Sequence, residues 1–324
     1  MISYIVRRIA MFVPMLLAIT LLNFLIMNIA PGDPLSSLMS PELAISPEQI
    51  EVLRVQMGLD RPWPVRYLIW LGQTAQGNLG FRQTPQDHGP VLDALKATIP
   101  KTLELMVAAI FIANVVGVSL GVISAVWRYS FTEYVLTVAA FLGVSTPGFF
   151  MALALMFFVG FKFDLLPISG YRTPLLPPST LDHLRYLVLP ASALALQYVA
   201  TMLRFTRTSM LEVMKQDYVT TARAKGLREA VVIFRHILRN AAFPLVTTIG
   251  LQLPNLVGGS IVIETIFAWP GMGFLAMDAL NARDYNLLMG ITLVGAVMVL
   301  CANLITDLVY TLVDPRARSS FVQG

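Results

Sequence analysis

Six long apolar segments constrain the fold of this chain more than any other feature of its sequence. They run over residues 9–29, 103–126, 134–161, 186–203, 243–267 and 287–313. A helix needs about 20 mostly apolar residues to cross roughly 30 Å of hydrocarbon, because each residue adds about 1.5 Å. We therefore expect an all-α integral membrane protein with about six transmembrane helices.

The fourth of these segments is the weakest prediction, because Pro190 and Gln197 interrupt it. Pro147 and Pro254 lie in two other segments. Proline would break a soluble helix, but spanning helices tolerate it where neighbouring helices satisfy the freed carbonyl. We therefore expect each of the six segments to form one span.

The composition supports a membrane protein. Charged residues make up 13% of the chain and hydrophobic residues 56%, with a mean hydropathy of +0.70. Soluble domains carry about 25% charged residues. This chain has too few charges to cover a globular surface.

The distribution of Lys and Arg predicts the orientation. With the N-terminus inside, the inner segments 1–8, 127–133, 204–242 and 314–324 hold 13 Lys and Arg against 5 Asp and Glu. In the outer segments, acidic residues slightly outnumber basic ones. Because cytoplasmic loops carry an excess of Lys and Arg, both termini are expected in the cytoplasm. The net charge of +4 therefore needs no nucleic-acid partner to explain it.

The first outer segment is too long for a bare loop, and it has its own helical patterns. Ser46 followed by Gln49 predicts the start of a capped helix. A second amphipathic piece starts near Pro64, and a third runs from Pro90 through Leu95. These pieces predict a small helical insertion on the outer face.

The expected organisation has four consecutive parts. An uncleaved anchor helix covers residues 1–30, because its apolar run is longer than the 7–15 residues of a signal-peptide core. The helical insertion covers residues 31–102, the core transmembrane domain 103–313 and a cytoplasmic tail 314–324.

The loop over residues 204–243, the coupling loop, carries the most informative pattern. Asp217 is expected to cap a short helix that stops at Gly226. A second helix follows, with an apolar stripe formed by Leu227, Val231, Phe234 and Leu238. Two interpretations remain open. The second helix could lie on the anionic inner leaflet, or the loop could dock a cytoplasmic partner.

Several motifs of this chain resemble one family. In the coupling loop, the run TARAKGL is followed by HILRN and AAFP. This resembles the EAA loop of binding-protein-dependent ABC importer permeases of the dipeptide/oligopeptide type. Gly226 matches the family glycine and Ala222 the second alanine. Thr220 stands where glutamate is usual, a departure that resembles the peptide-permease variant.

Motifs outside the coupling loop agree with this resemblance. They are the stretches 4–8, 29–34 and 77–80, the Trp-Pro-Gly-Met-Gly run at 269–273 and the Arg-Asp-Tyr run at 283–285. The resemblance covers nearly the whole chain. It implies a type I ABC importer permease fold, in the bacterial or archaeal cytoplasmic (inner) membrane.

The resemblance also implies the partners. They are a second homologous permease subunit, two cytoplasmic ATPase subunits, an extracytoplasmic substrate-binding protein and membrane lipid. Together with the resemblance, the helical pattern of the coupling loop gives the candidate ATPase-coupling residues. They are Asp217, Tyr218, Ala222, Arg223, Ala224, Lys225, Gly226, Leu227 and Arg228.

Polar residues within or next to the spans are the remaining site candidates, because polar groups at membrane depth are usually functional. The candidates for lining the pathway are Gln252, Asn255 and Asn114. The candidates for an extracytoplasmic gate are Glu264, Trp269, Pro270, Gly271, Arg283 and Asp284.

The sequence gives little support for an enzyme. The Gly-x-Ser-x-Gly pattern at 117–121 is expected within a helix, where it favours close packing over a nucleophile. All three histidines are expected in loops, so an intramembrane protease would lack its base. No G-x-x-x-x-G-K-[ST] run occurs, and no cofactor or metal site is expected in this chain. ATP and Mg²⁺ would be bound by the partner subunits.

The cargo is left open by these patterns. Permeases of this type are similar across importers for dipeptides, oligopeptides, nickel chelates, glutathione and oligosaccharides. Peptide is the favoured cargo. A self-contained secondary transporter is a weaker alternative, because no inverted repeat is visible in the sequence.

Overall fold

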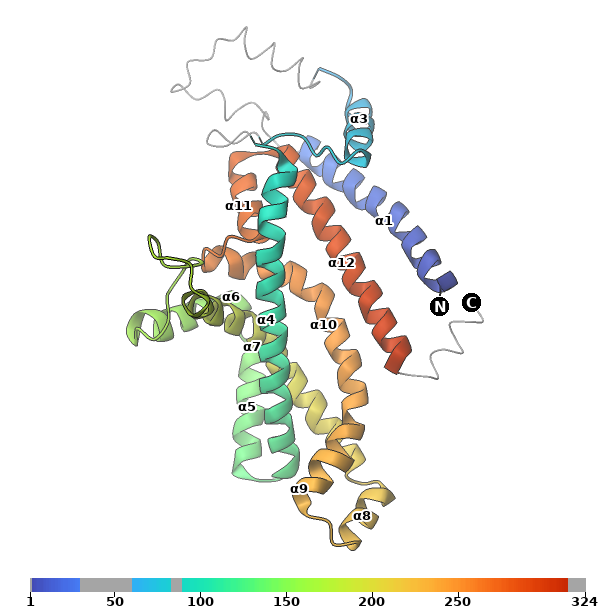
Figure 1. The fold of residues 1–324 in the computed structure, drawn as a ribbon, viewed down its shortest axis with the longest axis vertical. Helices are drawn as coiled ribbons and strands as arrows, with labels where there is room; N and C mark the ends of the chain where they lie inside the picture. Colours follow the sequence, from blue (N-terminus) through green and yellow to red (C-terminus); the bar gives the residue numbers. More distant parts are fainter. Residues whose placement is uncertain (1, 30–59, 83–88, 314–324) are drawn as a thin grey trace. The chain divides into compact units, whose positions relative to one another are not determined.

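The computed structural model describes residues 2–29, 60–82 and 89–313, and Figure 1 gives the helix labels used below. The chain divides into two compact units. Unit 1 contains Met1–Thr102 and Pro270–Leu300, and unit 2 contains Leu103–Trp269 and Cys301–Gly324. Within the described ranges the secondary structure is helical, with one isolated bridge between Phe81 and Pro90.

Unit 1 is built from helices at both ends of the chain. They are α1 (Ile2–Ile29), α3 (Trp63–Ala75), the start of α4 (Val91–Val126), α11 (Met272–Ala282) and most of α12 (Tyr285–Val313). The side chain of Tyr67 joins α3 to α1. Its hydroxyl lies 3.0 Å from Oγ1 of Thr20 and donates to the carbonyl of Leu17 at 3.2 Å.

The structure tests the three helical pieces expected in the first outer segment. The piece near Pro64 is confirmed as α3, whereas the helix expected at Ser46 lies outside the described residues. The third piece is not a separate helix. Val91 and Leu95 form the first turns of α4, where they are fully buried against the core that contains Leu287.

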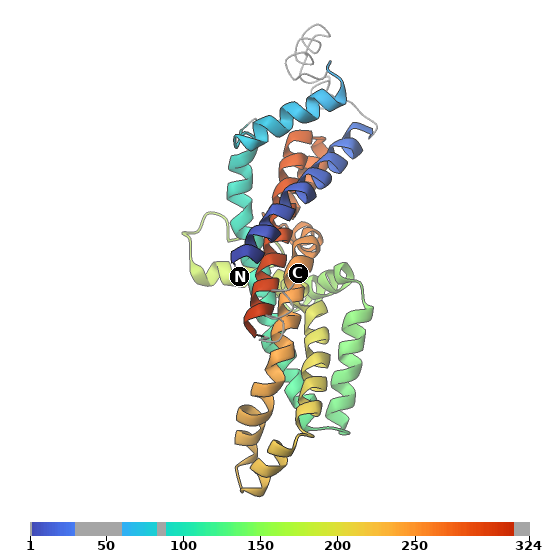
Figure 2. The ribbon, with the colours of Figure 1, turned by 90° about the vertical axis from the view of Figure 1, so that its right-hand side faces the viewer.

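Unit 2 contains the remaining helices, grouped around α7. They are α5 (Phe131–Ser145), α6 (Gly148–Leu155), the π-helical η2 (Met156–Lys162), α7 (Thr180–Val213), α8 (Asp217–Ala224), α9 (Glu229–Val231), the π-helical η3 (Val232–Leu238) and α10 (Arg239–Ile266). Helix α7 contacts α5, α6 and α10, and Figure 2 shows α5, α7 and α10 side by side.

The expected fourth span is the most buried of the candidate spans. In α7, 56% of the most apolar window is buried, against 28% in α4. A helix that contacts protein on several sides needs less apolar surface than one facing lipid. This explains why the central helix gave the weakest hydropathy signal.

Four helices are long and apolar enough to cross a membrane, judged over the described residues by length and composition. Two bent pairs would raise the number to six: Phe131–Ser145 with Gly148–Lys162, and Glu229–Ala242 with Pro244–Pro254. The prediction of about six spans therefore holds only if each bent pair counts as one span.

The expected span over residues 134–161 is not one continuous helix. Helices α5 and α6 meet at an angle of 111°. Thr146, at the end of α5, has φ −88° and ψ 129°, and Pro147 caps α6 with ψ 137°. The ring of a proline disfavours the helical conformation in the residue before it. Pro147 therefore ends one helix and starts another (Figure 1).

Helices α4 and α7 pack closely at two small residues. A Cβ added to Gly117 would lie 2.7 Å from Cβ of Met202, and one added to Gly121 would lie 2.5 Å from Cβ of Thr206. Both distances are too short for a side chain. The structure thus confirms that the Gly-x-Ser-x-Gly pattern serves helix packing.

An ion pair fixes the start of α5 to α7. Ser130 caps α5 by accepting from the amide of Glu133 at 3.2 Å. The carboxylate of Glu133 is buried, accepts from the amide of Tyr129 and forms an ion pair with Arg207. A buried carboxylate left without its partner is strongly destabilising, so this pair constrains how α5 lies on α7.

Candidate functional site

The helices of the coupling loop pack through a small apolar core. Val219 and Ala222 of α8 are buried with Val232 and Ile237 of η3 and with Met210 of α7. Asp217 does not cap α8, because it is the first helical residue and Gln216 precedes it without a side-chain capping bond. The expected position of α8 is confirmed, but the capping role of Asp217 is wrong.

The expected apolar stripe of the second helix is wrong for three of its four residues, whereas Leu238 is partly buried against the core. Leu227 is 41% exposed, Val231 37% and Phe234 62%. The buried residues of this segment are instead Val232 and Ile237, which are five positions apart. A π-helical turn brings residues five apart onto one face, whereas the prediction assumed 3.6 residues per turn. The predicted stripe is therefore largely an exposed apolar surface.

Gly226 forms the tight turn between α8 and α9. Its φ is +74°, and a Cβ at this position would meet nothing within 4 Å. An exposed ion pair spans the turn, with Nη2 of Arg223 2.7 Å from Oε1 of Glu229. The hydrogen bond to Glu229 raises the pKa of Arg223 above its ordinary value. The turn at Gly226 is thus exposed and open to approach.

Apart from Ala222, all the candidate coupling residues are exposed. The exposed ones are Asp217, Tyr218, Arg223, Ala224, Lys225, Gly226, Leu227 and Arg228. The structure therefore places this predicted set in α8 and in the exposed turn that follows it, within unit 2 (Figure 1).

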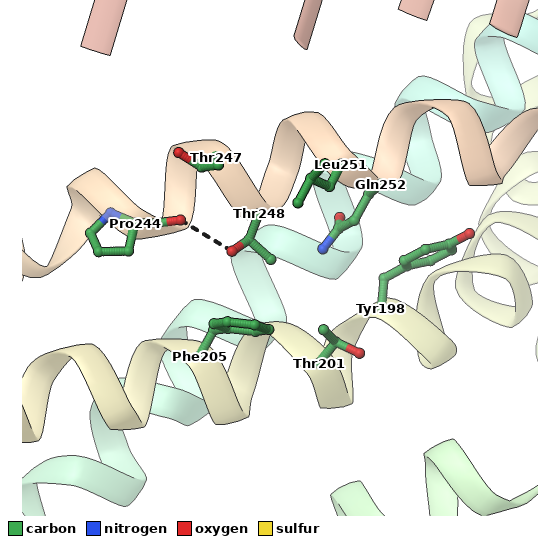
Figure 3. A pocket seen from close by; sticks show the side chains of 8 residues that line it. All are labelled: Tyr198, Thr201, Phe205, Pro244, Thr247, Thr248, Leu251 and Gln252. Carbon is green, nitrogen blue, oxygen red and sulfur yellow. Dashed lines mark hydrogen bonds between the residues drawn. The ribbon is translucent and has the colours of Figure 1, made fainter. Parts of the chain in front are cut away.

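A groove between α7 and α10 is the main cavity of interest in unit 2, and we call it the α7–α10 groove. Its larger part has a volume of about 520 Å³ and is lined by Tyr198, Thr201, Phe205, Pro244, Thr247, Thr248, Leu251 and Gln252 (Figure 3). Its smaller part, about 230 Å³, is lined by Thr201, Arg204, Phe205 and Thr208. The two parts share Thr201 and Phe205, so they form one groove along α7.

Gln252 is the polar residue buried most deeply in this groove. Its side chain extends from α10 toward α7 (Figure 3), and its relative exposure is 5%. Neither Nε2 nor Oε1 has a hydrogen-bond partner among the residues that the structure describes. A buried polar group without a partner costs about 1–3 kcal/mol, so this amide would gain from any group that pairs with it.

The other two candidates for lining the pathway have different outcomes. Asn114 lies on α4, where its Nδ2 donates to the carbonyl of Ile110 at 2.8 Å, and it does not line the α7–α10 groove. The side chain of Asn255 lies outside the described part of α10. Of the three candidates, Gln252 is the one found among the described residues that line the groove.

The sequence analysis missed the α7 side of the groove. Tyr198, Thr201, Arg204 and Thr208 recur every three or four residues, a pattern that predicts one helix face. This polar face begins within the apolar segment 186–203 and continues past its end. The recurrence of polar residues on one face would have indicated a helix that lines a cavity.

Trp269, a predicted gate residue, is completely buried in a cluster of aromatic and charged side chains. We call this the His183 cluster; it contains Glu104, Tyr171, His183 and Trp269. The ring of Trp269 lies 4.8 Å from that of Tyr171 and 5.7 Å from that of His183. Gly170 also donates its amide to the carbonyl of Phe267 at 2.8 Å, which ties the segment before α7 to the end of α10.

The polar groups of the His183 cluster have partners. Nε2 of His183 lies 2.5 Å from Oε1 of Glu104, and Nδ1 lies 3.2 Å from the carbonyl of Tyr171. The hydroxyl of Tyr171 donates to Oε2 of Glu104 at 3.3 Å. Burial, the charge of Glu104 and this bond raise the pKa of Tyr171. The phenol is therefore a neutral donor at neutral pH.

The other gate candidates lie in two units. Glu264 is buried in unit 2, and its carbonyl accepts from the amide of Trp269 at 2.8 Å. In unit 1, Gly271 precedes α11, Arg283 ends it with φ 54°, and Oδ1 of Asp284 accepts from the amide of Leu287 at 3.0 Å. Asp284 thus caps α12. Pro270 also belongs to unit 1. The gating role of all six remains a prediction.

The expectation that all histidines lie in loops is wrong for the described residues. His183 lies in the first turn of α7 and His236 in η3, while His88 lies outside the described ranges. Both ring nitrogens of His183 have partners in the His183 cluster. Among the described residues, no three His, Cys, Asp or Glu side chains come together as metal ligands.

Several potential spans and a groove along α7 are features of a multi-pass membrane protein. Comparison with known families gives the particular family. Residues 117–319 match the binding-protein-dependent transport system inner membrane components, and residues 1–106 match the N-terminal family of these membrane components. The chain therefore belongs to the binding-protein-dependent transport system inner membrane component family.

Similar proteins cover nearly the whole chain. A putative peptide permease protein of Brucella ovis is 44% identical over 98% of this chain and 99% of its own length. The oligopeptide transport system permease protein AppB of Bacillus subtilis is 41% identical, and the dipeptide transport system permease protein DppB of Escherichia coli 38%, over the same shares. The resemblance to permeases of the dipeptide/oligopeptide type is thus confirmed.

A solved structure supports the fold. A chain of the inward-facing methionine ABC transporter MetNI covers 68% of this chain and 96% of its own length, with a TM-score of 0.56 and 16% identity. This likeness concerns the fold alone. Together with the family match, it confirms the all-α, type I ABC importer permease fold.

Proposed function

We propose that this chain is a permease subunit of an ATP-driven importer that carries di- and oligopeptides across the inner membrane. The observation that carries the proposal is its similarity, over 98% of its length, to relatives named as peptide, oligopeptide and dipeptide permeases. The chain provides half of the pathway, and a second homologous permease subunit provides the other half. A substrate-binding protein delivers the peptide from outside.

Two cytoplasmic ATPase subunits supply the energy for transport, and one of them binds this chain at the turn around Gly226. The exposed coupling residues and the exposed apolar Leu227, Val231 and Phe234 offer it a surface. The core of Val219, Ala222, Val232 and Ile237 makes the region rigid enough to pass on rigid-body motion. The chain itself acts as a transport subunit, and its partners bind ATP and Mg²⁺.

A substitution at Gly226 tests the docking surface. Gly226→Trp is expected to abolish co-purification of the ATPase, because it places a bulky side chain where the ATPase approaches. Gly77→Trp is the matched control, since Gly77 also has a positive φ (+80°) and open space around it. Gly226→Asn separates bulk from backbone strain, because Asn tolerates positive φ. Full ATPase binding by Gly226→Trp would contradict the assignment.

The orientation has a separate test. With both termini in the cytoplasm, the turn at Gly226 also faces the cytoplasm. Lys225→Cys, in a Cys301→Ser background, should then react with a membrane-impermeant maleimide in inside-out vesicles and be protected in right-side-out vesicles. The opposite labelling pattern would contradict the proposal that this turn binds a cytoplasmic ATPase.

The cargo has its own test. Uptake of nickel chelates, glutathione or oligosaccharides instead of peptides would contradict the proposed cargo, but it would leave the proposed binding of the ATPase unaffected.

A further inference from the structure

The α7–α10 groove contains a buried amide and an exposed guanidinium for which the described part of the chain provides no partner. Gln252 is one of them, buried on the α10 side with both amide atoms unpaired. Arg204 is the other, exposed on the α7 side in the smaller part of the groove. The groove is otherwise mainly apolar, so these two groups determine which ligand chemistry fits it.

Arg204 differs from the arginine one turn further along α7. Arg207 pairs with the buried carboxylate of Glu133, through Nε at 2.7 Å and also through Nη2. Arg204 has no acidic partner among the residues that the structure describes. Arginine binds a carboxylate with two parallel hydrogen bonds, so a free guanidinium in a groove is suited to an anionic group of this kind.

Gln252 adds a second and different requirement. A primary amide offers two donors and one acceptor. A peptide group presents one C=O and one N–H, so it can satisfy both the donor and acceptor sides of Gln252. A carboxylate would satisfy only the donors. The side-chain amide therefore favours a peptide group over a second carboxylate.

The two parts of the groove follow one another along α7. Gln252 and Thr201 line the larger part of the groove, and Arg204 follows Thr201 by three residues. Three residues of helix rise by about 4.5 Å. An extended peptide advances by about 3.3–3.6 Å per residue. A peptide whose C-terminal carboxylate binds Arg204 would therefore extend its last peptide groups into the larger part, which Gln252 lines.

The remaining lining explains how varied side chains could fit. Phe205, Leu251 and Tyr198 provide apolar surface without a charge that would select one side chain. The larger part, about 520 Å³, lies within the usual 300–1,000 Å³ of ligand sites. The groove can therefore bind the carboxylate and peptide groups that all peptides share, and its apolar lining can contact side chains of different kinds.

We propose that the α7–α10 groove binds the C-terminal end of the peptide cargo, with Arg204 on the carboxylate and Gln252 on a neighbouring peptide group. This inference rests on the proposed function, because it assumes that the cargo is a peptide. It adds a specificity rule to that function. The permease itself prefers a free C-terminus, in addition to any selection by the binding protein.

The test compares trialanine with trialanine amide in the complete importer, reconstituted in proteoliposomes. Each probe is supplied on preloaded binding protein at equal, limiting concentration, and the initial rate of uptake is measured. Arg204→Gln is expected to slow uptake of the free acid about tenfold and to leave uptake of the amide nearly unchanged. Arg204→Lys should retain part of the preference, because it keeps the charge but loses the two-point geometry.

Two further variants sharpen the result. Gln252→Leu is expected to slow both probes by a similar factor, because both contain peptide groups. Arg128→Gln is the matched control for Arg204→Gln. It removes an exposed arginine from a segment that is also predicted to be cytoplasmic, but it lies outside the groove and the coupling loop. It should leave the uptake of both probes unchanged.

The possible outcomes separate the two proposals. Equal slowing of the acid and the amide by Arg204→Gln would overturn the carboxylate site while leaving peptide import in place. Loss of co-purification with the second permease in both groove variants would show that the groove is a subunit interface, which also overturns it. If the wild-type importer takes up neither probe, the proposed cargo fails and the groove assignment fails with it.

Discussion

The two ends of α7 differ in whether the polar side chains there have hydrogen-bond partners. At its start, both ring nitrogens of His183 have partners, and Glu104, Tyr171 and Trp269 close the cluster. Toward its other end, Arg204 and the facing Gln252 lie in a groove without partners. The satisfied polar groups hold helices together, whereas the unsatisfied ones are available to a ligand. We therefore expect mutations at the two ends to have different consequences.

The largest expected effect is on stability, at the His183 cluster. Trp269→Ala removes a completely buried side chain and should lower the free energy of unfolding by about 3–5 kcal/mol. Leu251→Ala in the groove is the matched comparison. Leu251 is 61% exposed, so its loss should change the free energy by less than about 0.5 kcal/mol. Chemical denaturation followed by circular dichroism measures both, and similar values for the two would break the comparison.

A smaller effect is expected from the carboxylate of the His183 cluster. Glu104→Leu leaves Nε2 of His183 and the hydroxyl of Tyr171 without their acceptor. The free energy of unfolding should fall by about 1–2 kcal/mol, since the site is partly exposed. Glu104→Gln retains an acceptor and should cost less than half as much. A destabilisation by Glu104→Gln equal to that by Glu104→Leu would show that charge, and not hydrogen bonding, holds the cluster.

The smallest effect on stability, with the opposite sign, is expected in the groove. Gln252→Leu replaces an unpaired buried amide with an apolar group of similar size. The free energy of unfolding should stay unchanged or rise by up to about 1 kcal/mol. Gln76→Leu, at an exposed position after α3, controls for the chemical change itself. A loss of more than about 1 kcal/mol in Gln252→Leu would mean that the amide has a structural role.

The coupling loop shows how far sequence patterns could predict the candidate site. The position of α8 and the turn at Gly226 followed from local preferences, because a short helix that ends at a glycine needs few distant contacts. The buried face of the next helix was predicted wrongly. The π-helical turn of η3 places Val232 and Ile237 on the buried face, where they pack against α8. The spacing of apolar residues along the sequence does not predict such contacts between helices.

The spans show the same limit. Apolar length located the helices, but it did not reveal that the segment over residues 134–161 bends by 111° at Pro147. It also ranked α7 as the weakest span, although α7 lies at the centre of unit 2. The polar face of α7 lowers its hydropathy because that face lines a groove and does not contact lipid. Hydropathy therefore identifies helices that face lipid more reliably than helices that lie inside a membrane protein.

The sequence by itself determined that this chain crosses a membrane, because hydrocarbon accepts only long apolar helices whose backbone groups are satisfied internally. Its motifs also placed it in the permease family. Only the tertiary structure decided which polar groups meet. Glu104 finds His183 79 positions away, and Glu133 finds Arg207 74 positions away. No local pattern encodes such pairs, since they depend on how whole helices pack. For the same reason, only the packed helices reveal that Gln252 and Arg204 find no partner within residues 2–29, 60–82 and 89–313.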